Sequence, residues 1–277
     1  TFQTDTIREI HPVADRRGDV DHHLAALAQL GLTVAIPDRV GAYSFSHDIT
    51  REVTYGLLPL TQRRPLHLAV ADWYEAALSD LDPHVAVLAE HCRRAGSAER
   101  AVGYFERAGT LALRSGAFTE AGGFFERSLE LDAGEDRARR ATWTKGIGTA
   151  HYFLGDLTAS RRCYEDAVAE LDRPVPTAGS ALTMGLAANV ARQAAHRFFP
   201  GRYAGRRADR AEHLDAAVDC YRTLGQIYFL DGEPPPALIY LTLAGLNVGE
   251  EAGPSPALAR ILINAGVGEI IGCARTG

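Results

Sequence analysis

The sequence predicts an all-α fold in which helical repeats follow a small N-terminal subdomain. From Gln62 onward, apolar residues recur at helical spacing and strand patterns are absent. Glycines and prolines separate the helical stretches from one another. A set of small and aromatic residues also returns on successive predicted helices, which is typical of stacked repeats.

The composition is that of an ordinary folded protein. Of 277 residues, 46% are hydrophobic and 23% are charged, which is enough to bury a sizeable core. The net charge of −6 argues against nucleic-acid binding by bulk electrostatics. The longest charge-free stretch, 174–191, contains two prolines and two glycines, and the opening TFQTDTIREI lacks the apolar core of a signal peptide. We therefore expect a cytoplasmic protein with no membrane partner.

The four cysteines are scattered along the chain, and none belongs to a CxxC pair. We expect them to be small core residues in a reducing compartment: Cys92, Cys163, Cys220 and Cys273. His84 and His91 lie two helical turns apart, too far to share an ion with Cys92, and His22 and His23 point to different sides of a helix. No metal site is expected.

Residues 1–58 predict a small winged-helix-like subdomain with a β-hairpin. The expected elements are a helix over 20–30 and two strands over 32–36 and 43–45, separated by turn residues at 38–41. Ser46 is placed to cap a further helix over 47–58, with Asp48 favourable in its first turn. A helix followed by such a hairpin is the pattern of a winged helix.

Residues 59–83 are expected to form a linking helix. Within it, a helix over 64–78 would place four apolar residues on one face: Leu66, Val70, Trp73 and Ala77. Further along the chain, helix breaks are expected at Gly96, Gly116, Gly134, Gly155, Pro174, Pro200, Gly232 and Pro254.

Three stretches fit the residue pattern of tetratricopeptide helix pairs, 109–128, 148–167 and 221–244. The pattern places a small residue where paired helices cross, a Gly or Asp at the turn, and then Ala, an aromatic residue and Ala on the second helix. The equivalent small residues are Ala121, Ser160 and Ala237, which are 39 and 77 residues apart, or about one and two periods. Since one pair cannot bury its apolar face alone, we expect residues 84–277 to form an α-solenoid that binds a protein or peptide on its concave face.

Two stretches resemble a known family. Residues 43–75, YSFSHDITREVTYGLLPLTQRRPLHLAVADWYE, resemble a junction in bacterial signalling ATPases of the STAND class. The matching residues are Phe45, His47, Tyr55, Leu58, Arg63, Leu66, His67, Ala71 and Glu75. Residues 224–259 are similar to the repeats of the subgroup that joins a class III adenylate/guanylate cyclase, an ATPase domain and tetratricopeptide repeats. Its matching residues are Asn247, Glu250, Gly253, Pro254, Ser255 and Pro256.

The sequence lacks the catalytic parts of such a protein. Nothing matches GxxxxGK[ST], and the glycines of Lys145-Gly146-Ile147-Gly148 lie in a predicted helix with the wrong spacing. Paired cyclase aspartates and a nucleophile elbow are also absent. We therefore expect no catalytic residue, cofactor or metal in this chain, which starts at Thr1 and resembles the tail of a longer protein. The resemblance implies ATP or ADP in an upstream ATPase domain that contacts this chain in cis.

His47 is the candidate nucleotide-sensing residue. In related ATPases of plant immunity and apoptosis, a His-Asp pair that opens a winged-helix element faces the ADP phosphates, and His47-Asp48 resembles that pair. The resemblance implies that His47 donates a hydrogen bond to phosphate. The alternative is that His47 only caps or packs at the start of a helix.

Two basic segments have a functional and a structural interpretation. Arg63, Arg64 and His67 either contact the ATPase domain or form the solvated start of a helix. Residues 192–210 hold six arginines interleaved with Phe198, Phe199 and Tyr203. This segment is either a site for nucleic acid or a phosphorylated partner, or a surface loop whose aromatic residues close the core.

The interpretation we favour is a regulatory, protein-interaction segment that controls a linked cyclase through the ATPase. One alternative is the repeat region of a transcriptional activator of the same class, which would carry a DNA-binding domain after residue 277. A second alternative is a free-standing scaffold of repeats with no nucleotide partner.

Overall fold

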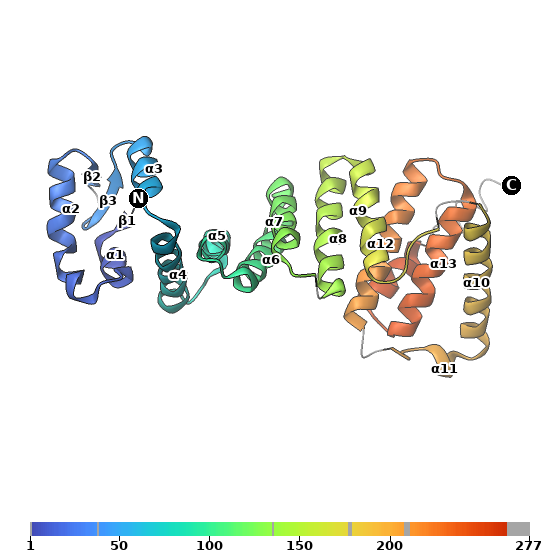
Figure 1. Ribbon diagram of the computed structural model, residues 1–277. Helices are drawn as coiled ribbons and strands as arrows, with labels where there is room; N and C mark the ends of the chain where they lie inside the picture. Colours follow the sequence, from blue (N-terminus) through green and yellow to red (C-terminus); the bar gives the residue numbers. More distant parts are fainter. Residues whose placement is uncertain (1, 38, 135, 177–178, 208–210, 265–277) are drawn as a thin grey trace. The chain divides into compact units, whose positions relative to one another are not determined.

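The computed structural model describes residues 2–37, 39–134, 136–176, 179–207 and 211–264. This part of the chain is mostly helical with one small sheet, which confirms the predicted all-α class (Figure 1). The chain divides into two compact units, Thr1–Ala108 and Gly109–Gly277, and the division falls within α6 (Ala98–Ser115). The domain boundaries expected after residues 58 and 83 stay predictions.

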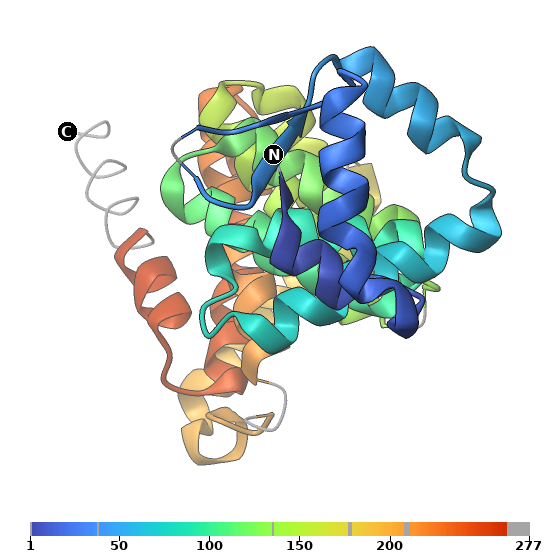
Figure 2. The same ribbon diagram turned by 90° about the vertical axis from the view of Figure 1, so that its left-hand side faces the viewer.

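The first unit begins with a sheet and the helices around it (Figure 2). Its elements before α6 are β1 (Phe2–Gln3), α1 (Thr4–Ile10), a 3-10 helix (Ala14–Asp19), α2 (Val20–Gln29), β2 (Thr33–Ala35), β3 (Ala42–Phe45), α3 (Asp48–Leu57), α4 (Leu60–Ala77), a second 3-10 helix (Asp82–His84) and α5 (Val85–Ala95). The strand order is β1-β3-β2, with antiparallel pairing that sets Val34 opposite Ser44. The predicted helix and hairpin are confirmed. The third strand, of two residues, was not predicted.

Two expectations about helix starts in this unit were wrong. The helix after the hairpin starts at Asp48, and Ser46 does not cap it, because its hydroxyl is buried without a hydrogen-bond partner in the described structure. The linking helix α4 starts at Leu60 rather than at residue 64. Its first turn is closed ahead of Pro65, since the carbonyl oxygen of Pro59 accepts hydrogen bonds from the next turn. Only Ala71 of α4 is fully buried, so the predicted apolar face is mostly half-covered.

The second unit continues from the end of α6 as a row of packed helices. Its elements are α7 (Phe118–Leu131), α8 (Arg137–Leu154), α9 (Leu157–Glu170), α10 (Gly179–Phe198), α11 (Pro200–Tyr203), α12 (Ala211–Leu230) and α13 (Pro235–Ala252), and residues 256–264 are also helical. The packing order is α7, α8, α9, α12, α13 and α10. One core runs through α9, α12 and α13, with Leu224, Ile227 and Leu241 fully buried.

Four turns between helices have the same geometry. Each contains a glycine with positive φ: Gly96 (84°), Gly116 (81°), Gly155 (85°) and Gly232 (72°). In each, the N–H of the residue after glycine donates to the carbonyl oxygen five residues earlier, at 2.9–3.0 Å. This is the Schellman arrangement, which favours glycine because L-residues rarely adopt positive φ. The predicted breaks at these positions are confirmed.

Three of these turns join helices that carry an equivalent pair of positions, a glycine on the first helix and a large side chain on the second. A methyl group added to Gly109 would lie 2.8 Å from the ring of Phe125, and one added to Gly148 would lie 3.2 Å from the ring of Tyr164. At the equivalent Gly225, where the partner position holds Leu241 rather than an aromatic residue, an added methyl group would meet nothing within 4 Å. The small residue therefore makes room for an aromatic ring in the first two pairs.

The turn at Gly96 belongs to a fourth helix pair of this kind, which was not predicted from the sequence. Ala101 and Phe105 are fully buried at the positions that Ala121 and Phe125 occupy after the next turn. The two turns are only 20 residues apart, because α6 is the second helix of one pair and the first helix of the next.

The helix α10 leaves the sequential order of the second unit. It follows α9 in the chain but packs against α13, on the side away from α12 (Figure 1). The chain then returns through α11 to α12, which packs against α9. α10 is thus a helix inserted between α9 and α12 in the chain that covers one side of α13.

Candidate functional site

His47 lies at the N-terminus of α3 with an exposed side chain. It is the N-cap residue, but through its backbone: its carbonyl oxygen accepts hydrogen bonds from the N–H groups of Thr50 (3.1 Å) and Arg51 (3.4 Å), and its side chain makes no capping bond. The first N–H groups of a helix and its dipole favour a nearby anion. The imidazole is therefore available to an anionic group outside the described structure.

An exposed apolar stripe runs along the same helix. Ile49, Val53 and Leu57 are each more than half exposed. Residues four apart share one face of a helix. No residue of α3 is buried, so this face is left uncovered by the part of the chain that the structure describes. An uncovered apolar helix face is typical of a contact surface.

Five side chains from α3, α4 and α5 meet where these helices adjoin. We call them the junction cluster: Tyr55, Arg63, His67, His91 and Arg94. The hydroxyl of Tyr55 is 2.8 Å from Nε2 of His67, and Nδ1 of His67 is 2.9 Å from Nδ1 of His91. A consistent arrangement has the hydroxyl donating to His67 and Nδ1–H of His67 donating to His91. The cluster joins the helix of His47 to α5.

Arg63 is occupied within the chain. Its guanidinium donates to the carbonyl oxygens of Leu58 (2.5 Å) and Gly56 (2.8 Å), at the C-terminal end of α3, and lies 4.5 Å from the ring centroid of Tyr55. A cation at this end complements the helix dipole and the free carbonyl groups. The predicted group Arg63, Arg64 and His67 is thus split: two members hold α3 against α4, and Arg64 is exposed.

Both histidines of the cluster titrate below the usual range. Burial is the largest cause, and with His91 and Arg94 nearby it lowers the pKa of His67 to about 4. Burial and Arg94 also lower the pKa of His91. Both imidazoles are consequently neutral at neutral pH. This suits a single proton shared across 2.9 Å, because two charged rings at that distance would repel each other.

Acidification should destabilise the first unit through this pair. An unfolded histidine has a pKa of about 6.5, so between that pH and about 4 the unfolded state binds protons that folded His67 does not bind. The contribution to stability is complete above pH 6.5 and is lost as the pH falls toward 4. The free energies of unfolding in urea at about pH 7 and about pH 5 should differ by roughly 1 kcal/mol from His67, a value reduced for partial solvent exposure.

The substitution His67→Gln removes the titrating group and should flatten this part of the pH dependence. His22→Gln, at an exposed position of α2, is the matched control and should leave the slope unchanged. Equal slopes for His67→Gln and the unmodified chain would contradict the assignment.

The other candidate metal ligands do not lie close together. His84 packs with its ring 5.4 Å from that of Tyr74, while His91 faces His67. His22 and His23 have ring centroids 6.1 Å apart and are both exposed. Within the described ranges, no three His, Cys, Asp or Glu side chains lie close enough to hold a metal ion.

The cysteines are free where the structure describes them. Cys92 and Cys220 are buried, as predicted for core residues, and Cys163 is half-buried. Burial raises the pKa of the Cys220 thiol to about 12, which keeps it protonated and inert. Cys273 lies outside the described residues.

The basic segment 192–210 is partly neutralised by two adjacent glutamates of α13. Glu250 accepts hydrogen bonds from Gln193 (3.2 Å) and lies 2.6 Å from Nδ1 of the buried His196. Glu251 pairs with Arg192 (4.0 Å) and Arg207 (3.6 Å). These contacts fix α10 and the stretch after α11 on α13.

Two of the three aromatic residues of this segment, Phe198 and Phe199, do not close the core, contrary to one of the two interpretations. Phe198 and Phe199 are 79% and 62% exposed. The inward place is taken by Tyr203, whose ring stacks on that of His196 with a centroid distance of 4.8 Å.

No protein-family model matches the chain. A protein of Rhizobium meliloti (strain 1021) that is described only as uncharacterized is 32% identical over 152 residues, which cover 49% of this chain and 14% of that protein. The chain therefore spans a small part of this relative's length. Among the residues that the structure describes, no helix has the length and apolar character needed to cross a membrane.

The junction cluster was only half visible in the sequence. His67 was a candidate through its resemblance to the ATPase junction, whereas His91 was grouped with its neighbours His84 and Cys92. Its true partner is 24 residues earlier on another helix. No local spacing rule connects two such positions.

Proposed function

We propose that the chain is a non-catalytic regulatory and protein-interaction segment of a signalling ATPase. The observation that carries the proposal is α3, which offers the exposed side chain of His47 beside the uncovered stripe of Ile49, Val53 and Leu57. The apolar stripe suits docking on another domain, and His47 suits a hydrogen bond to an anion held by that domain. In this proposal residues 1–58 are the winged-helix-like end of the ATPase module.

The helix pairs support a tetratricopeptide-like solenoid after residue 84. Four turns share one geometry, and two pairs share a glycine that admits the aromatic ring of the partner helix. Neighbouring pairs also share a core, as stacked repeats require. Exposed apolar side chains at the ends of α8 and α12, among them Leu154 and Phe229, support a protein or peptide partner.

Partner binding would act on the upstream ATPase by shifting its populations. If the partner binds more tightly when the ATPase holds ATP than when it holds ADP, binding favours the ATP state by that difference in affinity. The junction cluster provides a mechanical connection, because it fixes α3 to α4 and α5. The resemblance implies that the output domain is a class III nucleotide cyclase. The matched residues cover only 14% of the Rhizobium meliloti relative, so that protein is long enough for such a multidomain architecture.

The proposal requires an upstream ATPase domain, and His47→Ala tests it in the parent protein. The reading frame before Thr1 should encode GxxxxGK[ST] and, before that, a domain with paired metal-binding aspartates. In the purified parent, His47→Ala should raise the rate of ADP release roughly tenfold, since a hydrogen bond to a charged group contributes about 1.5–3 kcal/mol. The release of a fluorescent ADP analogue measures this rate.

His23→Ala is the matched control, because His23 is another exposed histidine of the first unit. It should leave ADP release unchanged. If His47→Ala releases ADP no faster than His23→Ala, His47 is not part of the nucleotide site. A start codon directly before Thr1 would exclude the upstream ATPase domain altogether.

A further inference from the structure

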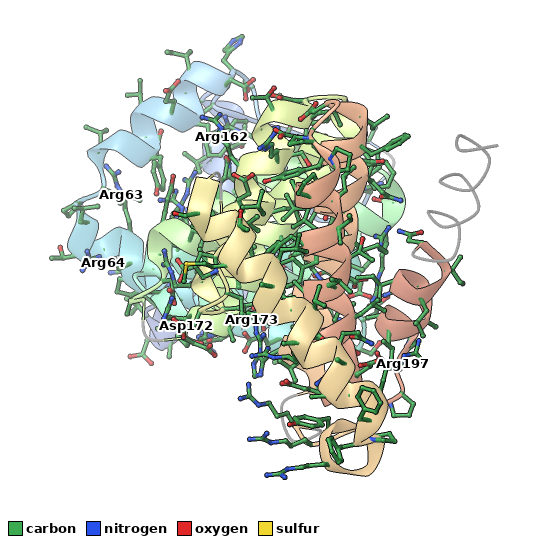
Figure 3. All side chains as sticks on the ribbon, turned by 90° about the vertical axis from the view of Figure 1, so that its right-hand side faces the viewer. Arg63, Arg64, Arg162, Asp172, Arg173 and Arg197 are labelled. Carbon is green, nitrogen blue, oxygen red and sulfur yellow. The ribbon has the colours of Figure 1, made fainter. Side chains whose placement is uncertain are left out.

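The corner at which α10 ends and α11 turns presents two adjacent phenylalanines to solvent. We call residues 196–207 the basic corner. Phe198 and Phe199, at 79% and 62% exposed, are its most prominent side chains. Figure 3 shows Arg197 on this end of the unit, with aromatic side chains beside it.

The exposure of these rings is built into the fold. His196, only 6% exposed, contacts Glu250 at 2.6 Å and stacks on Tyr203. On the other side of the turn, the N–H groups of Gly205 and Arg207 donate to the carbonyl oxygens of Glu250 and Glu251, each at 2.9 Å. Both ends of the corner are therefore fastened to α13, and the two phenylalanines between them point outward.

The corner also carries exposed positive charge. Arg207 and nearby Arg192 pair with Glu251. Arg197, Arg202 and Arg206 are exposed, and none of them has a carboxylate partner among the residues that the structure describes. Three exposed arginines without a carboxylate partner in the described structure thus share this short segment with two exposed aromatic rings.

We propose that the basic corner attaches the chain reversibly to an anionic lipid surface. Phe198 and Phe199 would enter the interface, while Arg197, Arg202 and Arg206 would bind lipid phosphates. A stable protein interface needs about 800 Å² per partner, whereas two phenylalanine side chains bury roughly 300–500 Å². Nucleic acid is less suited, because it needs a basic groove that follows the backbone, and the whole chain has a net charge of −6.

This inference is independent of the ATPase proposal, and it revises the expectation of no membrane partner. That expectation rested on the lack of a spanning segment. Attachment through a corner needs no span, because two side chains inserted to the depth of the headgroups and a few basic residues provide reversible binding.

Sedimentation of the 277-residue chain with lipid vesicles tests the proposal. The chain should bind vesicles that contain phosphatidylglycerol, bind pure phosphatidylcholine at least tenfold more weakly, and dissociate as salt is raised. The double variant Phe198→Ser/Phe199→Ser should lose roughly tenfold or more in partitioning. The triple variant Arg197→Gln/Arg202→Gln/Arg206→Gln should lose at least tenfold, since each arginine near an anionic surface contributes about fivefold.

Phe229→Ser is the matched control, because Phe229 is 58% exposed near the end of α12 but lies close in sequence to Asp231 and Glu233. It should bind vesicles as the unmodified chain does. All substituted side chains are exposed, and circular dichroism melting verifies that each variant folds. The proposal is overturned if the chain ignores anionic vesicles, binds neutral ones equally, or binds equally after both sets of changes. Loss of binding to a single-stranded oligonucleotide in the arginine variant, without vesicle binding, would assign the corner to nucleic acid instead.

Discussion

Replacing Phe125 with alanine should lower the free energy of unfolding by about 3–5 kcal/mol, a large effect for a single substitution. The ring of Phe125 is buried between glycines of two neighbouring helices. A methyl group added to Gly109 of α6 would lie 2.8 Å from a ring carbon, and one added to Gly146 of α8 would lie 2.5 Å from another. Phe125 projects from α7, and its ring fills the space between α7 and these two helices. Its removal therefore leaves a cavity. Urea unfolding followed by circular dichroism measures the loss.

The glycines provide a matched control for this interpretation. Gly109→Ala should destabilise the chain by about 1–3 kcal/mol, because the added methyl group meets the ring of Phe125. Gly225→Ala occupies the equivalent position before its own turn, where an added methyl group meets nothing within 4 Å. It should stabilise the chain by up to about 1 kcal/mol through helix propensity. Equal effects of the two substitutions would refute the packing argument.

The turns and helix pairs could be predicted because their causes are local. Glycine adopts the positive φ that commonly ends a helix more readily than other residues do, so the breaks at Gly116, Gly155 and Gly232 could be predicted from the sequence alone. The small residue and its aromatic partner lie within 16 residues of each other, as Gly109 and Phe125 do. The pair at Gly96 was missed because α6 serves two pairs, which breaks the expected period.

The contacts that the sequence did not predict are tertiary. His67 and His91 meet only because α4 and α5 pack together, and neither position has a local signature. The inward position of Tyr203 in the basic corner also has a tertiary cause, because it depends on the packing of α10 against α13. This packing places His196 against Glu250, and the ring of Tyr203 stacks on the ring of His196.

Replacing Glu250 with alanine should release α10 from α13 and lower the free energy of unfolding by about 2–3 kcal/mol. The carboxylate of Glu250 is the shared partner of His196 and Gln193. Its removal leaves a buried imidazole and an amide without their acceptor, which costs more than the loss of one exposed hydrogen bond. Glu250→Gln keeps an acceptor oxygen but loses the charge, so it should cost about half as much.

Amide hydrogen exchange distinguishes a local release from general destabilisation. In Glu250→Ala, amides of α10 should lose more protection than amides of α8, because α8 and α10 are not neighbours in the packing order of the unit. Glu130→Ala, at an exposed position of α7, is the control and should change neither. If α8 and α10 lose protection equally, Glu250 supports the unit as a whole rather than the attachment of α10. In that case Phe198 and Phe199 should keep their exposed positions in Glu250→Ala. A local release of α10 would instead free both rings from the fixed basic corner and weaken vesicle binding.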